Sequence, residues 1–208
     1  MPLGEVAHRV ELPGLSGRWS LLAPPELDLT GVPAPMGGAF GRGGVFRVGD
    51  VVLRPYRRGG LVRHVLKDRY LSPGRFMDEL IVHRTLWEAG LPTVEPLGVA
   101  WQSAGLGVRG VYLTAFAPGR PWPRTWGDHL PEGLGQAIRA LAAWGLWNPD
   151  LNATNVHLLQ DGGLALLDWD RAGWNSSRDL LDRYKGRLRR SLHRLQAPAT
   201  LLQGLEAL

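Results

Sequence analysis

The chain contains no cysteine, which excludes disulfides, thiolate zinc sites and cysteine nucleophiles. It has no apolar run near the ~18 residues that a membrane-spanning helix needs. Its first residues carry neither the basic segment nor the apolar segment of a secretory signal. The six histidines form no H-x-x-x-H pair and no G-x-S-x-G motif occurs, so neither a zinc site nor a serine hydrolase is indicated. A cytoplasmic location is therefore expected.

The remaining composition is that of a globular protein with unevenly placed charge. The 208 residues are 44% hydrophobic and 21% charged, which suits one sizeable domain or two small lobes. The net charge of +5 arises from two basic patches: residues 54–69 hold six cations and one acid, and residues 183–194 hold six cations and no acid. Such patches attract the phosphates of nucleic acid, of lipid head groups or of an anionic small substrate. Either patch alone is explained equally well as a solvated helix face.

The most informative pattern is a pair of acidic motifs joined by a predicted hairpin. Asp150 and Asn155 have the spacing of the protein-kinase catalytic loop, H-R-D-x-x-x-x-N. Two short apolar runs, 156–159 and 164–167, flank a turn-forming segment and predict a β-hairpin that returns Asp168 to the same end. Phosphoryl transfer needs a carboxylate base together with an Asn and an Asp that hold Mg²⁺. Either motif alone reads as a turn, a helix cap or a strand-ending acid, but the two in this order favour kinase-like chemistry.

Upstream, the sequence offers the parts that would present a nucleotide. Glycines at 37–44 precede two β-prone runs, 45–48 and 51–54, around a Gly-Asp turn. Arg54 ends the second run, where kinases carry a Lys. An amphipathic helix over 76–87, with Phe76, Leu80, His83 and Trp87 on one stripe, carries Glu79. Glu79 is the candidate partner of the strand cation, with Asp78 and Glu88 as rivals.

The remaining segments predict an α+β fold. Strands are expected at 94–100 and 110–116, and helices at 134–147 and 178–195. The expected divisions are a loose lead-in over 1–36 with one edge strand near 19–22, an N-lobe over 37–116 and a C-lobe over 117–208. The N-lobe is a small antiparallel sheet with one main helix, and the C-lobe is mostly helical.

In this order the parts resemble the lipopolysaccharide kinases and, among them, the Kdo kinases, which phosphorylate a 3-deoxy-manno-octulosonic acid sugar on lipid A precursors. The similarity extends over about residues 37–195. The blocks that carry it are Gly41-Arg42-Gly43, Leu53-Arg54-Pro55-Tyr56-Arg57-Arg58-Gly59-Gly60-Leu61, Lys67-Asp68-Arg69-Tyr70-Leu71, Gly90-Leu91-Pro92, Asp150-Leu151-Asn152-Ala153-Thr154-Asn155, Asp168-Trp169-Asp170-Arg171 and Arg189-Arg190-Ser191-Leu192.

The resemblance implies a two-lobed protein-kinase-like fold that uses ATP and Mg²⁺ to phosphorylate a sugar hydroxyl. It makes Asp150 the catalytic base and Asn155 and Asp168 the metal ligands. It assigns the nucleotide phosphates to Gly41, Gly43, Arg54 and Glu79, and acceptor contacts to Arg57, Arg58 and Asp170. Asp170 has a second interpretation, as a structural partner of Arg171.

The implied partner is an anionic sugar or glycolipid, and nucleic acid is not expected. Such kinases act from the cytoplasm at the inner face of the inner membrane, where basic patches gain ~1 kcal/mol per cation from anionic lipid.

Two residues depart from the family pattern. Asn148 stands where a His-x-Asp opening is usual, and Thr154 stands where a His is common. Two alternatives therefore stay open. One is a kinase-fold phosphotransferase for another small-molecule or sugar acceptor. The other is a non-catalytic kinase-fold module that binds anions.

Overall fold

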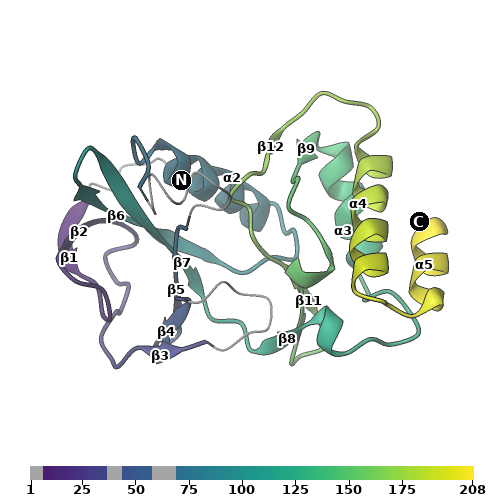
Figure 1. The fold of residues 1–208 in the computed structure, drawn as a ribbon, viewed down its shortest axis with the longest axis horizontal. Helices are drawn as coiled ribbons and strands as arrows, with labels where there is room; N and C mark the ends of the chain where they lie inside the picture. The colour runs from purple at the N-terminus through teal and green to yellow at the C-terminus, as the bar shows by residue number, and fades with distance from the viewer. Residues whose placement is uncertain (1–6, 37–43, 58–68) are drawn as a thin grey trace. The chain divides into compact units, whose positions relative to one another are not determined.

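The computed structural model describes residues 7–36, 44–57 and 69–208. The chain divides into two compact units, shown in Figure 1. Unit 1 comprises Met1–Ile81 and Glu95–Phe116, and unit 2 comprises Val82–Val94 and Ala117–Leu208. One boundary between the units falls between Phe116 and Ala117, and residues 82–94 group with unit 2.

Unit 1 is built on an antiparallel sheet. Within the described residues it has seven strands in the order β1-β2-β6-β7-β5-β4-β3. The predicted hairpin is formed by β4 (Phe46–Val48) and β5 (Val51–Pro55), and Gly49 takes a φ of 54° in its turn, which favours glycine. The other predicted strands are β6 (Pro96–Ala104) and β7 (Gly107–Ala115), which pair with each other.

The N-terminal segment is more ordered than predicted. It contributes β1 (His8–Glu11), β2 (Arg18–Leu22) and β3 (Ala34–Pro35) to the sheet. The expected edge strand is an inner one, because β1 pairs with β2 on one side and β6 pairs with it on the other, as Figure 1 shows. Its prolines and glycines lie mainly in the segments that connect these short strands. Trp19 and Leu21 are buried in the core of the unit.

Helix α2 (Gly74–Glu88) packs on the sheet through its first half. Phe76 and Leu80 are buried with Tyr56 and Tyr112, and the Phe76 and Tyr56 rings lie 4.3 Å apart between centroids. The predicted stripe is wrong at its last position. Trp87 is 42% exposed, and Leu86 is buried in its place.

Unit 2 is mostly helical, around a core that includes Ile138, Leu151 and Trp169. Its helices are α3 (Leu134–Ala143), α4 (Leu180–Arg194) and α5 (Ala199–Glu206), with short 3-10 turns η1 (Trp122–Arg124) and η2 (Ala153–Asn155). Its strands are β8 (Gly119–Pro121), β9 (Leu146–Trp147), β10 (Val156–Leu159), β11 (Leu164–Leu166) and β12 (Gly173–Trp174).

The β10–β11 hairpin and α4 confirm the predictions for this half of the chain. The predicted helix over 134–147 is too long. It ends at Ala143 because Gly145 takes a φ of 70° and turns the chain into β9. Helix α5 was not predicted.

The α+β class is confirmed: the antiparallel sheet with one main helix and the mostly helical unit are the parts predicted for a protein-kinase-like fold. In the part of the chain that the structure describes, no helix is both long and apolar enough to cross a bilayer.

Candidate functional site

The two acidic motifs of unit 2 are tied together by Asn148, which is completely buried. Its side-chain Nδ2 donates to the backbone oxygen of Asp168 at 2.9 Å, and its Oδ1 accepts the backbone N–H of Asp150 at 2.9 Å. Both functional groups of one amide are therefore used to hold the loop that carries Asp150 against the segment that carries Asp168.

Asn155 closes the same loop. Its Nδ2 donates to the backbone oxygen of Asp150 at 2.9 Å, and its backbone oxygen accepts from the N–H of Leu167 at 2.8 Å. Asn152 caps η2 by accepting the N–H of Thr154 at 2.9 Å. The β10–β11 hairpin thus returns the chain to the loop, and the structure brings Asp150, Asn155 and Asp168 together as their spacing predicted. Asp168 has a φ of 67°, which is uncommon for a residue other than glycine.

Helix α4 holds the loop through two residues whose role sequence reasoning missed. The Tyr184 hydroxyl donates to the backbone oxygen of Leu146 at 2.8 Å and accepts the N–H of Asn148 at 2.9 Å. Burial raises the pKa of Tyr184 to about 12, so this hydroxyl stays protonated and remains a donor. Ser191, on the buried side of α4, accepts the N–H of Ala153 at 3.1 Å. The available signal was a serine between Leu188 and Leu192, two apolar residues at helical spacing.

Asp150 stands among charges of both signs. Its carboxylate lies 3.6 Å from the Arg171 guanidinium. Burial raises the pKa of the Asp150 carboxyl; Arg171 and Arg187 oppose this rise, and Asp168 and Asp170 add to it. A carboxylate with a raised pKa is a better proton acceptor than an ordinary aspartate.

The donor set suits a hard cation. Asp168 offers carboxylate oxygens, and the bond of Asn155 to Asp150 uses its amide nitrogen, which leaves its Oδ1 available to a cation. Among the described residues, no three Asp, Glu or His side chains are grouped closely enough to hold a metal ion. Mg²⁺ in phosphoryl-transfer sites is usually held by one or two carboxylates together with substrate phosphates and water. The residues present therefore fit Mg²⁺ that is bound with a nucleotide.

Unit 1 places two of the predicted nucleotide residues in one cluster. Glu79 is only 2% exposed, and its carboxylate is bound by the Arg54 guanidinium and by the Tyr56 hydroxyl. Burial and the charge of Glu79 raise the pKa of Tyr56, so its hydroxyl remains a donor. The rivals Asp78 and Glu88 are exposed.

The other predicted residues of unit 1 are less defined. Gly41, Gly43 and Arg58 lie outside the described residues. Arg57 is exposed and lines a cavity of about 380 Å³ together with Arg69 and Arg109.

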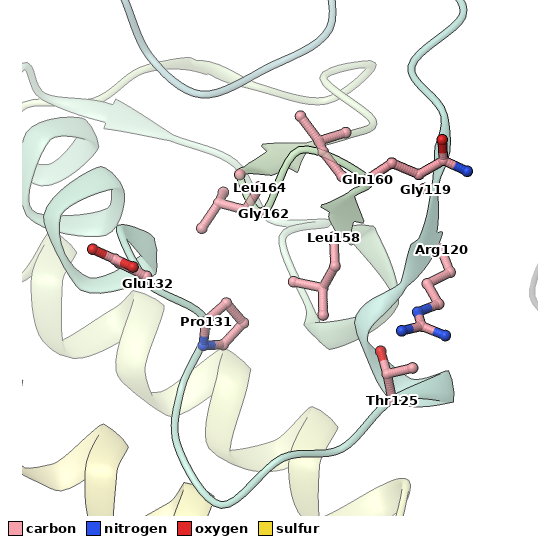
Figure 2. Close-up of a pocket in the computed structure, with 11 residues that line it drawn as sticks. Gly119, Arg120, Thr125, Pro131, Glu132, Leu158, Gln160, Gly162 and Leu164 are labelled. Atoms are coloured by element: carbon pink, nitrogen blue, oxygen red, sulfur yellow. The ribbon is translucent and has the colours of Figure 1, made fainter.

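A larger pocket of about 610 Å³ lies in unit 2, beside the β10–β11 hairpin. Figure 2 shows Arg120 and Thr125 on one side of it and Pro131 and Glu132 on the other. None of the three converging residues lines this pocket. Pocket volume therefore does not identify the candidate site. The convergence of Asp150, Asn155 and Asp168 does.

Comparisons with known proteins agree with these motifs. The model of the Lipopolysaccharide kinase (Kdo/WaaP) family matches residues 32–200. The chain is 35% identical over 147 residues to the 3-deoxy-D-manno-octulosonic acid kinase of Xanthomonas oryzae pv. oryzae (strain PXO99A), a match that covers 63% of this chain and 58% of that relative. The identity is 33% over 177 residues to the protein of that name in Xanthomonas campestris pv. campestris (strain B100), which covers 77% of this chain and 70% of the relative.

Among solved structures, the chain is similar to monomeric WbdD, with a TM-score of 0.49 and 17% identity. The match covers 78% of this chain and 44% of the WbdD chain. That similarity is too weak to support an inference about function. The chain also spans less than two thirds of the X. oryzae relative. The family model, in contrast, covers most of the sequence. The chain therefore belongs to the lipopolysaccharide kinase (Kdo/WaaP) family.

Proposed function

We propose that this chain transfers the γ-phosphoryl group of ATP to a sugar hydroxyl, and that the acceptor is the 3-deoxy-manno-octulosonic acid (Kdo) of a lipid A precursor. The observation that carries the proposal is the convergence of Asp150, Asn155 and Asp168 around one loop held by Asn148. The names of the Xanthomonas relatives support the choice of acceptor.

In this reaction Asp150 accepts the proton of the acceptor hydroxyl as its oxygen bonds to the γ-phosphorus. The bond between that phosphorus and the β–γ bridging oxygen breaks, and ADP leaves with the electron pair. Mg²⁺, when bound, neutralises charge on the phosphates, and Asn155 and Asp168 are the residues assigned to hold it. The bonds that Asp150 makes through its backbone fix the loop and leave its carboxylate for the acceptor.

In unit 1, the Arg54–Glu79 pair is proposed to order nucleotide phosphates. Glu79 binds the guanidinium, and the ring centroids of Tyr56 and Tyr112 lie 5.2 and 5.4 Å from it. Arg keeps its charge at any working pH and binds phosphate through a planar fork, so it can replace the Lys of other kinases with a different geometry. Gly41 and Gly43 are assigned to the same nucleotide, and Arg57 and Arg58 to the acceptor.

The basic surface of α4 is proposed to keep the chain near anionic lipid at the cytoplasmic face of the inner membrane. Arg190 and Arg194 are exposed on this helix, whereas Arg189 is paired with Glu206 of α5. Cations near such a surface each gain about 1 kcal/mol, so attachment to vesicles should weaken as salt is added.

The acceptor assignment is tested with purified chain, Mg²⁺-ATP and a Kdo-bearing lipid A precursor. We expect a product heavier by one phosphate in the mass spectrum, and no product when Mg²⁺ is chelated. A panel of neutral sugars and aminoglycosides run alongside separates this acceptor from other small molecules. Transfer to a panel member but not to the Kdo acceptor would contradict the acceptor and keep the reaction; no transfer to any acceptor would contradict the reaction.

The pH dependence of transfer should follow the ionisation of Asp150. A general base works only when it is deprotonated, so transfer falls as the pH drops through its pKa. Burial raises that pKa and Arg171, 3.6 Å away, lowers it. The Arg171→Gln variant should therefore move the acid limb of kcat/KM to higher pH, while Arg178→Gln, an exposed arginine nearby in sequence, should leave it in place. A limb that stays or moves to lower pH in Arg171→Gln would contradict the role of Asp150 as base.

A further inference from the structure

Arg187 of unit 2 has three other arginines near it, and two of these four, Arg171 and Arg187, lie near Asp150. Arg171 follows the Asp168 motif and lies 3.6 Å from the Asp150 carboxylate, with its side chain 60% exposed. Arg187 of α4 is partly buried, and its Nε donates to the backbone oxygen of Leu151 at 3.3 Å. Burial lowers the pKa of Arg187; the charge of Asp150 opposes this, and the charges of Arg190, Arg171 and Arg194 lower it further. Each of these three guanidiniums is therefore near enough to Arg187 to repel it.

The arginines of α4 fall into two sets. Arg183 lies over the Trp147 ring, 4.2 Å from its centroid, and Arg189 forms an ion pair with Glu206 of α5. Arg187, Arg190 and Arg194 follow one another at helical spacings of three and four, so they share a side of the helix. Among the described residues, none of these three has a carboxylate within ion-pair distance.

Repulsion between the partly buried Arg187 and its exposed neighbours costs free energy, and a bound anion would relieve it. The acids near Asp150 do not serve this purpose well. In the proposed function Asp168 is assigned to the metal, and Asp150 must stay available to the acceptor hydroxyl. Arg187 uses Nε on the loop, which leaves its two Nη nitrogens as a fork of the kind that binds carboxylate or phosphate through two bonds.

We infer that Arg187, together with Arg190 and Arg171, binds an anionic group of the acceptor beside the hydroxyl that Asp150 deprotonates. The group is a carboxylate on the sugar or a phosphate on the glycolipid. This inference rests on the proposed function and adds a specificity-determining residue to it. An acceptor that lacks the anion would then be a poor substrate although its hydroxyl is intact.

The opposing explanation is that Arg187 only holds the loop through the oxygen of Leu151. The two explanations differ in one measurable respect. Loss of a loop support lowers transfer to every acceptor by the same factor, whereas loss of an anion site lowers transfer only to acceptors that carry the anion.

The test compares native chain, Arg187→Gln and Arg189→Gln with four acceptors: the Kdo-bearing lipid A precursor with its phosphates, the same precursor dephosphorylated, and the carboxyl methyl ester of each. A charge-assisted hydrogen bond contributes about 10- to 100-fold in affinity. Arg187→Gln should lower kcat/KM by about that factor for acceptors that retain the recognised anion, chiefly through KM. It should change kcat/KM little for acceptors without it.

Which anion is recognised follows from the arm in which the loss disappears: esterification points to the carboxylate, and dephosphorylation points to the phosphate. Arg189→Gln removes the same charge from the same helix and should leave the ratios between acceptors unchanged. An equal loss on all four acceptors in Arg187→Gln would overturn the inference and leave Arg187 as a loop support.

A failure of the proposed function is distinguishable from a failure of the inference. If native chain transfers phosphate to none of the four, the proposed function is wrong. Calorimetric binding of the free Kdo sugar acid, and of inorganic phosphate, to native chain and to Arg187→Gln then still tests the anion site. Equal binding of both probes by the two proteins would overturn it.

Discussion

The Asp150→Asn variant is expected to transfer phosphate to its acceptor about 10²- to 10⁴-fold more slowly than native chain, the range that a positioned general base contributes. Asparagine has the same shape but cannot accept the proton. The bonds that hold this residue use its backbone: its N–H donates to Asn148, and its oxygen accepts from Asn152 and Asn155. The loop should therefore survive the substitution, which removes the proton acceptor and the partly exposed ion pair with Arg171. The measurement is kcat/KM for the Kdo acceptor with Mg²⁺-ATP.

Stability supplies the internal control for this variant. Because burial raises the pKa of Asp150, the native fold favours the protonated form, and the ionised carboxylate destabilises the fold above that pKa. A neutral Asn removes this effect, so the urea midpoint at neutral pH should be equal to or higher than that of native chain. Asp128→Asn, at an exposed loop position, should change neither rate nor midpoint. Near-native transfer by Asp150→Asn would show that Asp150 is not the base.

The parts of the site that could be predicted from sequence are those set by local spacing. The separation of Asp150 and Asn155 fits one closed loop, and the turn composition between the two apolar runs fixes where the hairpin reverses. Periodicity also favours Glu79 over its rivals. It lies next to Leu80 and three residues from Phe76, on the side of α2 that the sheet buries.

The parts that could not be predicted depend on contacts between distant segments. Tyr184 and Ser191 bond to loop residues more than thirty positions away in the sequence. These contacts depend on how α4 packs and not on any local pattern. The N-terminal strands were missed for a related reason. Their prolines and glycines resemble those of a loose segment, and the pairing of β2 with β6 spans some eighty residues. Propensity carries little information about such pairings.

Asn148 is the residue whose importance sequence reasoning most underestimated, since it registered only as a departure from a family histidine. The structure gives its amide two distinct tasks, donation to the Asp168 oxygen and acceptance of the Asp150 N–H. A histidine ring also offers one donor and one acceptor nitrogen. Asparagine can therefore replace the histidine as a link between the two acidic motifs.

The Asn148→Asp variant separates these two tasks. It keeps the oxygen that accepts from Asp150 and replaces the donor nitrogen with a second oxygen that faces the carbonyl of Asp168. At neutral pH this places a charge in a fully buried position beside two acids, and a buried donor lost in this way costs about 3 kcal/mol of unfolding free energy. Transfer should fall sharply as well, because Asp168 is no longer held against the loop.

The stability deficit of Asn148→Asp should depend on pH. Burial and the neighbouring acids favour the protonated form of the introduced carboxyl, and a protonated carboxyl can donate to the Asp168 oxygen again. The stability deficit relative to native chain should therefore shrink as the pH falls and grow as it rises. Urea unfolding at several pH values, followed by the fluorescence of the nine tryptophans, measures it.

Asn175→Asp is the matched control. Asn175 uses its Oδ1 to accept the N–H of Ser177 at 2.9 Å, and an aspartate keeps that oxygen. The control should lie within about 0.5 kcal/mol of native chain at every pH. If Asn148→Asp behaved like this control, Asn148 would not be the link between the two motifs, and the convergence of Asp150 and Asp168 would have to depend on the hairpin and on α4 alone.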